Sequence, residues 1–211
     1  MKLNKKLLIL TTALCLLPIL AGLAVYSRLP EQVPTHFDFN GTPNGWSSRP
    51  FAVFGLPCIM AAANLLLHIV TVRDPKRANV STTLKAILLW LLPVLSVFCC
   101  SLTLGTALGY DLPTETLAPC LVGVLLILVG NYLPKTRQNR TMGIRVKWTL
   151  GSEENWNRTH RMAGFLWVAG GFIFLLLTLL HLWNGWLLTI LLAVIVLIPM
   201  FYSWQLHKKG I

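Results

Sequence analysis

Charge is scarce in this chain of 211 residues, and negative charge is the scarcest. Only 12% of the residues are charged, about half the share of a typical soluble domain, and 7 acidic residues stand against 18 Lys and Arg. By contrast, 55% of the residues are hydrophobic. These proportions argue against a soluble globular domain and favour a protein that is embedded in a membrane.

The usual signatures of catalysis and metal binding are missing as well. No G-x-S-x-G or H-E-x-x-H motif occurs, and the five cysteines form no C-x-x-C pair. His36 and Asp38 point to one side of an extended strand, but two ligands do not define a metal site. We therefore predict no metal and no cofactor, and an enzyme is the less favoured class.

Six long apolar runs are present, at residues 7–26, 51–72, 86–108, 117–133, 163–182 and 186–204. Each is close to the roughly 20 residues that a helix needs to cross about 30 Å of hydrocarbon. The first run is longer than the apolar core of a signal peptide, so we interpret it as an uncleaved span. The sequence predicts an all-α polytopic membrane protein with six transmembrane helices.

The basic residues are distributed asymmetrically between the two sides of the membrane. With six spans, both termini lie on one side, and this side receives every Lys and Arg except Arg28 and Arg49. Because Lys and Arg concentrate in cytoplasmic loops, we predict a multi-pass cell-membrane protein with both termini in the cytoplasm. The net charge of +11 then indicates contact with anionic lipid headgroups of the bilayer, not direct binding of nucleic acid.

Two connections between the spans are long enough to fold. We expect an N-terminal two-span unit, 1–72, with an extracytoplasmic loop at 27–50, and a four-span unit, 73–211, with a structured cytoplasmic loop at 134–162. The two units are expected to form one integrated membrane domain.

The outer loop has the pattern of a small folded cap. Residues 35–39 alternate as in a short strand, with Phe37, Phe39 and Trp46 as apolar contacts, and Asn40-Gly41 and Asn44-Gly45 are typical of turns. Exposed aromatic residues there are candidates to receive a peptide or a lipid. The candidate binding residues are Pro34, His36, Phe37, Asp38, Gly41 and Trp46.

The inner loop contains a helix start. Ser152 is a good N-cap, and Glu153 and Glu154 in the first turn suit the helix dipole. This helix places Trp156 and His160 on one face and continues into the fifth span. Anchoring to lipid and direct binding of a partner both remain open for these residues.

The segment before that helix is rich in turns. Asn139, Arg145 and Trp148 are expected to build a polar site there, against Asn131 at the end of the fourth span.

Polar groups within the spans are few. Asn64 and His68 lie four residues apart and share one helix face. No carboxylate lies deep in a span, which weakens the case for an ion-coupled transporter. His68 is either a proton site or a hydrogen-bonded packing residue. Gly105-x-x-x-Gly109 and Gly170-Gly171 predict close helix contacts.

Two motifs together resemble the SdpI-type bacterial immunity-protein family. The inner motif is Gly130-Asn131-Tyr132-Leu133-Pro134-Lys135, Asn139, Gly143-Ile144-Arg145, Trp148-Thr149-Leu150, Glu153, Trp156, Thr159-His160-Arg161 and Gly164. The outer motif, Leu29-Pro30-x-x-Val33-Pro34-x-His36-Phe37 with Gly41 and Trp46, is similar to a small uncharacterised domain often found at that family's N-terminus.

This resemblance implies a six-span protein that gives resistance to a secreted killing-factor peptide and signals to a small winged-helix repressor. By similarity, the outer loop meets the toxin and the basic inner loop meets the cytosolic partner. The two alternatives are a transporter or exporter of a peptide or lipid, and a membrane enzyme at the inner leaflet. The candidate residues of the inner site are Asn131, Pro134, Asn139, Gly143, Arg145, Trp148, Thr149, Trp156, His160 and Arg161.

Overall fold

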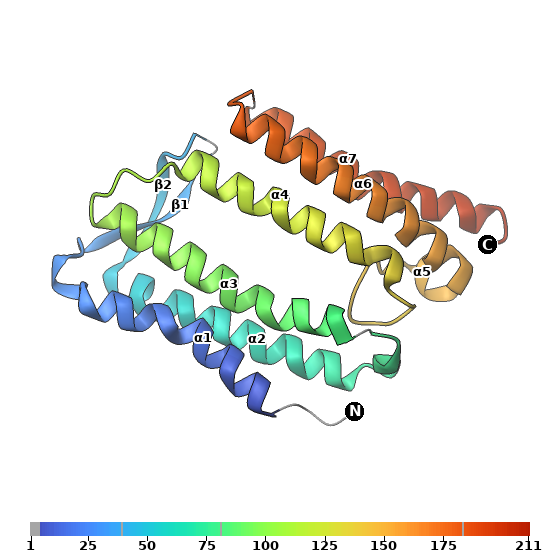
Figure 1. Cartoon of the computed structure of the whole chain (residues 1–211), viewed down its shortest axis with the longest axis horizontal. Coiled ribbons are helices and arrows are strands. Elements are labelled where there is room, and N and C mark those ends of the chain that lie inside the picture. Colours follow the sequence, from blue (N-terminus) through green and yellow to red (C-terminus); the bar gives the residue numbers. More distant parts are fainter. Residues whose placement is uncertain (1–4, 39, 81, 183) are drawn as a thin grey trace. The chain divides into compact units, whose positions relative to one another are not determined.

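The computed structural model describes residues 5–38, 40–80, 82–182 and 184–211 (Figure 1). Within these ranges, six helices are long and apolar enough to cross a membrane, which confirms the predicted class of polytopic helical membrane protein. They are α1 (Lys5–Ala24), α2 (Leu56–Arg73), α3 (Thr82–Ala107), α4 (Thr114–Tyr132), α6 (Glu153–Leu179) and α7 (Gly185–Lys208). A hairpin of β1 (Gln32–Phe37) and β2 (Pro43–Ser48) separates α1 from α2, and the short α5 (Lys147–Gly151) precedes α6.

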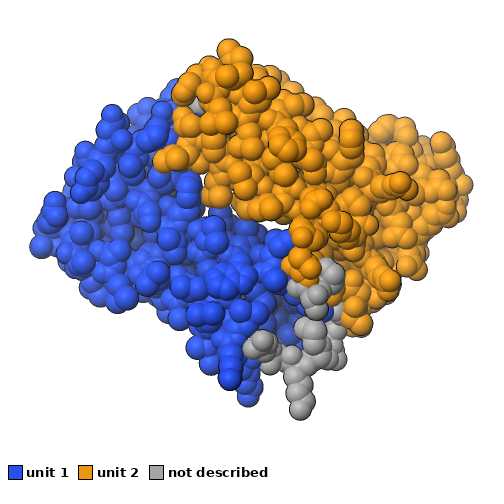
Figure 2. Space-filling model, viewed as in Figure 1, with its two compact units in different colours: residues 1–73, 85–115 blue, residues 74–84, 116–211 orange. Residues whose placement is uncertain are grey.

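The chain divides into two compact units, coloured separately in Figure 2. The first unit comprises residues 1–73 and 85–115, and the second comprises 74–84 and 116–211. The loop between α2 and α3 therefore belongs to the second unit, although α2 and most of α3 belong to the first. The sequence-based division at residue 72 remains a prediction.

In the first unit, α1 packs closely against the start of α2. The chain enters α2 through one π-helical turn, Phe51–Gly55. Gly22 of α1 faces this turn, and a Cβ atom at Gly22 would lie 2.7 Å from a methyl carbon of Val53. The hydroxyl of Ser96 on α3 donates to the Cys15 carbonyl of α1 at 2.7 Å. Small residues and one buried hydroxyl thus join three apolar helices.

The hairpin is folded around Asp38. One carboxylate oxygen of Asp38 accepts from the backbone N–H groups of Asn40 and Thr42, both at 2.9 Å, which builds the tight turn. Gly41 has a φ of +76° in this turn, and its carbonyl accepts from the Thr114 hydroxyl at 3.0 Å. The predicted cap and the turn at Asn40-Gly41 are confirmed; Phe39 lies outside the described residues.

The second turn predicted in this loop, at Asn44-Gly45, is wrong. Both residues lie within β2, and Gly45 is the partner of His36 across the hairpin. A Cβ atom at Gly45 would lie 2.9 Å from the His36 Cβ, so glycine makes room for a cross-strand side chain at a β-bulge.

In the second unit, α4 and α6 approach through two pairs of glycines. A Cβ atom at Gly123 would lie 3.2 Å from the Gly171 carbonyl oxygen, and one at Gly164 would lie 2.8 Å from the Gly130 carbonyl oxygen. The sequence order of the two pairs makes the helices antiparallel. The predicted Gly105-x-x-x-Gly109 contact is wrong, because α3 ends at Ala107 and Gly109 has a φ of +85° in the turn that follows.

The core of this unit includes α7. Leu126, Phe174, Leu188 and Ile195 form a buried apolar cluster from α4, α6 and α7. Pro199 in α7 has no backbone N–H and leaves the Ile195 carbonyl without its helical donor. The indole N–H of Trp167 on α6 donates to this carbonyl at 2.9 Å. One tryptophan thereby satisfies the group that proline leaves unpaired and joins α6 to α7.

Candidate functional site

The segment from residue 133 to residue 152, here called the connector, joins α4 to α6 and carries most of the inner motif. It begins with a 3-10 turn at Leu133–Lys135 and ends at Ser152, the N-cap of α6. Apart from α5 it has little regular structure, so its backbone groups depend on side chains for hydrogen bonds. The predicted start of α6 is confirmed: the Ser152 hydroxyl accepts from the Asn155 N–H at 3.2 Å.

Trp156 and His160 form the centre against which the connector folds. Both side chains are fully buried, and their rings stack with centroids 4.0 Å apart. The Trp156 indole donates to the Thr136 carbonyl at 2.6 Å, and His160 Nε2 accepts from the Ile144 N–H at 2.9 Å. These contacts attach both halves of the connector to one face of α6.

The hydrogen bonds also fix the state of His160. Its Nε2 atom accepts from an amide and is therefore unprotonated, whereas its Nδ1 atom lies 2.8 Å from the Trp156 carbonyl and must donate. The imidazole is the neutral tautomer with hydrogen on Nδ1. With both nitrogens occupied and the ring buried, His160 positions the connector and has no nitrogen left for proton transfer to a substrate.

Gly143 is required by this histidine. Its φ is +101°, and a Cβ atom there would lie 2.3 Å from His160 Nε2 and 3.1 Å from the Trp156 ring. Both the backbone conformation and the close approach therefore demand glycine. The sequence analysis named Gly143 and His160 as candidate residues of one site, but it did not predict that they are in contact.

Asn139 and Thr149 hold the connector internally, and both are fully buried. The Asn139 side-chain oxygen accepts from the N–H groups of Thr141 at 2.9 Å and Met142 at 2.7 Å. The Thr149 hydroxyl donates to the Ile144 carbonyl at 2.7 Å and accepts from the Val146 N–H at 3.1 Å. Each side chain replaces backbone pairing that an irregular segment lacks.

The loop between α2 and α3 clasps the connector through Asp74, which is 3% exposed. Its carboxylate accepts from the Arg140 N–H at 2.8 Å, the Thr141 hydroxyl at 2.6 Å and the Lys76 N–H at 2.7 Å. Burial alone would raise the pKa of this carboxyl. The hydrogen bonds from Thr141, Lys76 and Arg140 outweigh burial, so the pKa of Asp74 lies below its ordinary value.

Gln138 completes this clasp, which we define as Asp74, Lys76, Asn79 and Gln138. The Gln138 amide donates to the carbonyls of Thr149 and Leu150 at 2.8 and 3.0 Å, and its oxygen accepts from the Lys76 ammonium. Asn79 donates to the Gln138 backbone carbonyl at 2.8 Å. The clasp thus ties the α2–α3 loop to both halves of the connector.

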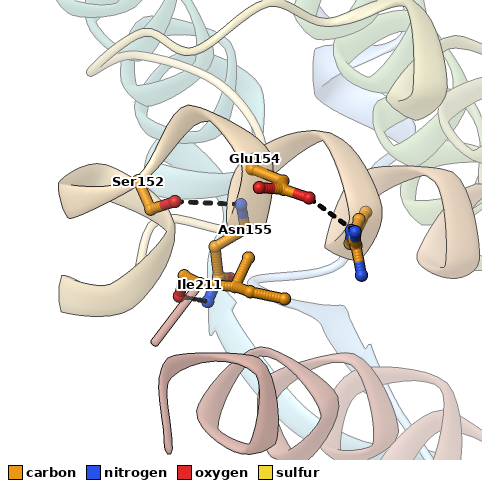
Figure 3. Close-up of polar contacts among 5 residues, drawn as sticks. Ser152, Glu154, Asn155 and Ile211 are labelled. Atoms are coloured by element: carbon orange, nitrogen blue, oxygen red, sulfur yellow. Dashed lines mark hydrogen bonds and ion pairs between the residues drawn. The ribbon is translucent and has the colours of Figure 1, made fainter. Parts of the chain in front are cut away.

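Asn155 joins α6 to α7 and to Ile211, and Figure 3 shows it beside Ser152 and Ile211. Its amide donates to the Ser203 carbonyl at 2.9 Å and to an Ile211 oxygen at 3.1 Å. Its side-chain oxygen accepts from the hydroxyls of Ser203 at 2.6 Å and Thr159 at 3.2 Å. The connector, the α2–α3 loop and the end of α7 therefore form one polar layer at the same end of the second unit.

The other predicted residues lie at the surface of this layer. Pro134 packs against Gly164, whereas Asn131 and Arg161 are exposed. Arg145 is exposed and donates to the Arg140 carbonyl at 2.7 Å. Trp148 is half-buried and stacks on His207 of α7. Arg145 and Arg161 belong to an exposed basic surface, defined here as Lys135, Arg137, Arg140, Arg145, Lys147, Arg161, Lys208 and Lys209.

On the hairpin of the first unit, Trp46 is 56% exposed, while its cross-strand partner Pro34 is buried. His36 is also exposed and lies 2.5 Å from the Asn44 side-chain oxygen. Phe37 and Asp38 are half-buried at the turn. The hairpin therefore presents Trp46 and the His36–Asn44 pair outward and uses its other predicted residues to hold its fold.

Asn64 lies buried in α2, where its amide donates to the hydroxyls of Thr11 and Thr12 on α1, both at 3.1 Å. Within the part of the chain that the structure describes, the side-chain oxygen of Asn64 and Nε2 of His68 are buried with no hydrogen-bond partner. The sequence allowed His68 to be a hydrogen-bonded packing residue, but its Nε2 atom makes no such bond with the described residues.

Sequence reasoning missed Asp74, Gln138 and Asn155. Asp74 and Gln138 occur in polar loops 64 residues apart, and nothing in the spacing pairs them. Asn155 had a usable signal, because it lies four residues before Thr159 and next to Trp156 on the buried side of α6. A polar residue within such a face requires partners.

The fold and this polar layer define a polytopic helical membrane protein with a folded connector between its fourth and fifth spans. Residues 135–203 match the SdpI/YfhL protein family, and residues 13–61 match a domain of unknown function, DUF1648. The first match covers most of the connector, α6 and most of α7. The second covers most of α1, the hairpin and the start of α2. The SdpI-type family resemblance is thereby confirmed.

Among curated proteins, the chain is 28% identical over 203 residues to Immunity protein SdpI of Bacillus subtilis (strain 168). The alignment covers 94% of this chain and 92% of the relative, so the two agree in length and in the order of their parts. No solved structure matches the chain.

Proposed function

We propose that this chain is a membrane immunity protein that protects its cell from an exported antimicrobial peptide. The observation that carries the proposal is the nearly full-length similarity to Immunity protein SdpI, which includes both the hairpin and the connector. Agreement over the whole length favours a shared activity more strongly than agreement over one segment.

The hairpin is the proposed contact for the peptide, on the extracytoplasmic side. It is braced from several directions: Arg49 donates to the Pro30 carbonyl at 3.2 Å, and Thr114 bonds the turn. A rigid two-stranded element with an exposed tryptophan offers area for contact at low entropic cost. Trp46, His36 and Asn44 are the proposed contact residues.

The basic surface of the connector is the proposed contact for a cytosolic partner, a small repressor. Its eight exposed cations favour an acidic or anionic surface. Signalling requires that peptide binding change the equilibrium between two arrangements of the protein. The proposed route from the hairpin to the connector is α2 and the clasp. The chain passes from the hairpin through the π-helical turn into α2, and Asp74 of the clasp follows the last residue of α2.

The test is survival of a sensitive bacterium that expresses this chain and is exposed to purified killing-factor peptide. The proposal is supported if cells that express the chain survive at least ten times the peptide concentration that kills cells with the empty vector. Survival equal to that of the empty vector refutes it. Trp46→Ala should remove protection at unchanged protein level. Arg145→Gln should retain protection and release a fluorescently tagged repressor from the membrane.

A further inference from the structure

A small cavity lies between α2 and α3 of the first unit, near the ends that face the α2–α3 loop. Its volume is about 40 Å³, which is room for roughly three water-sized groups. The wall consists of Leu67, His68, Thr71, Val72, Lys85, Leu88 and Leu89. One imidazole and one ammonium group therefore share a cavity with apolar side chains.

The buried nitrogen of His68 calls for an occupant. His68 is 7% exposed, and its Nε2 atom is shielded from solvent and has no hydrogen-bond partner among the described residues. An unpaired polar atom in such a place destabilises the fold, because it has lost its hydrogen bonds to water without replacement. Thr71 does not supply the bond, because its hydroxyl donates to the Leu67 carbonyl at 2.8 Å. A ligand with an acceptor oxygen would remove this cost.

The distance of the cavity from the ends of α2 and α3 indicates which class of ligand can reach it. His68 lies five residues before the end of α2 at Arg73, or about 7 Å along the helix axis. Lys85 lies three residues after the start of α3, or about 5 Å. The headgroup region extends about 5–7 Å beyond the hydrocarbon on each side of a bilayer. With the ends of α2 and α3 placed at the outer edge of the headgroup region, both groups lie at the depth where the phosphates and ester groups of lipids occur.

The lining favours a partly apolar occupant over a free ion. A free phosphate needs several donors, whereas leucine and valine make up most of this wall beside one imidazole and one ammonium group. A cation and one N–H group beside leucines fit a molecule that is anionic at one end and apolar at the other.

We propose that this cavity binds the phosphate group of a membrane phospholipid. The Lys85 ammonium and the His68 Nε2–H donate to the phosphate oxygens, and Leu67, Leu88 and Leu89 contact the glycerol and the first acyl carbons. The site does not depend on the proposed immunity function, and the two can fail separately.

The test uses the full chain, purified in mild detergent and stripped of lipid. Phosphatidylglycerol is added back, and the bound lipid is counted by native mass spectrometry while the melting temperature Tm is measured. Wild type should bind the lipid and gain several degrees in Tm. His68→Leu and Lys85→Gln should each bind at least fivefold less and lose that gain.

The controls separate binding from folding. Without lipid, His68→Leu should be no less stable than wild type, because it removes a buried polar atom without a partner. His68→Gln keeps an N–H donor and should retain most of the lipid, as should Lys209→Gln, which changes an exposed lysine of the other unit. Equal lipid binding in wild type, His68→Leu and Lys85→Gln would overturn the proposal. So would stabilisation by inorganic phosphate alone, or a cavity that holds only water.

Discussion

Gly143 is the residue at which the fold of the connector is most sensitive to a single atom. Gly143→Ala places a methyl group against His160 in a backbone conformation with φ of +101°. We expect a loss of about 2 kcal/mol or more of stability, from strain and from the displaced Ile144–His160 hydrogen bond. The measurement is the Tm of the purified protein in detergent.

The matched control at this scale is Gly151→Ala, because a Cβ atom there meets no other atom within 4 Å. We expect its Tm to stay within about a degree of wild type. If Gly143→Ala were as stable as Gly151→Ala, His160 would not pack against Gly143 as described here.

Asp74 gives the clasp a dependence on pH. The pKa of its carboxyl is lower in the folded protein than the ordinary value near 4, so its contribution to stability is fully present above that value. The contribution is lost as pH falls through the lowered pKa of the folded state. We expect Asp74→Asn to lose about 1–3 kcal/mol at pH 7. Melting curves between pH 7 and pH 3 should show the difference between the two proteins shrinking below pH 4.

The outcome that would contradict this account is a constant difference at every pH. Glu153→Gln serves as a control, since Glu153 is exposed in the first turn of α6 and is not part of the clasp.

At the scale of elements, α4 and α6 depend on glycines for their distance. A side chain at Gly164 would meet Pro134 carbons at 2.5 Å and the Gly130 carbonyl oxygen at 2.8 Å. Gly164→Leu should therefore separate the two helices and cost about 3 kcal/mol. Phe165→Leu is the control, because Phe165 is 80% exposed on the same helix. The measurement is the fraction of folded, monodisperse protein after extraction in detergent. Equal fractions for the two variants would exclude close packing of α4 against α6.

Helices could be predicted from the sequence where neighbouring residues determine them. Run length and hydropathy predicted the spans, and Ser152 with Glu153 and Glu154 predicted where α6 begins. The Gly105-x-x-x-Gly109 prediction failed because α3 ends at Ala107, so Gly109 lies in the following turn and not on a helix face. The working pairs, Gly123 with Gly171 and Gly130 with Gly164, join residues more than 30 positions apart.

The site shows the same division. Trp156 and His160 could be placed on one face because they lie one helical turn apart. The clasp could not be foreseen, because a buried carboxylate such as Asp74 is satisfied by amides that only the folded connector brings near it. Loop polarity alone does not distinguish a solvated loop from one that is bonded to a distant segment.

At the scale of the whole molecule, one orientation in the membrane decides the position of every loop. The α2–α3 loop, the connector and the end of α7 are held together in the second unit by the clasp and by Asn155. They must therefore lie on one side of the membrane, and the distribution of Lys and Arg predicts the cytoplasmic side.

This orientation is tested by single cysteines in a variant that lacks the five native ones. Ser48→Cys lies on the exposed side of the hairpin, and Arg145→Cys lies on the basic surface. A membrane-impermeant thiol reagent should label Ser48→Cys in intact cells and Arg145→Cys only after the membrane is opened. The reverse pattern would place the basic surface outside the cell and exclude its contact with a cytosolic repressor. Labelling of both in intact cells would place the hairpin and the connector on the same side of the membrane, which three crossing helices between them, α2, α3 and α4, do not allow.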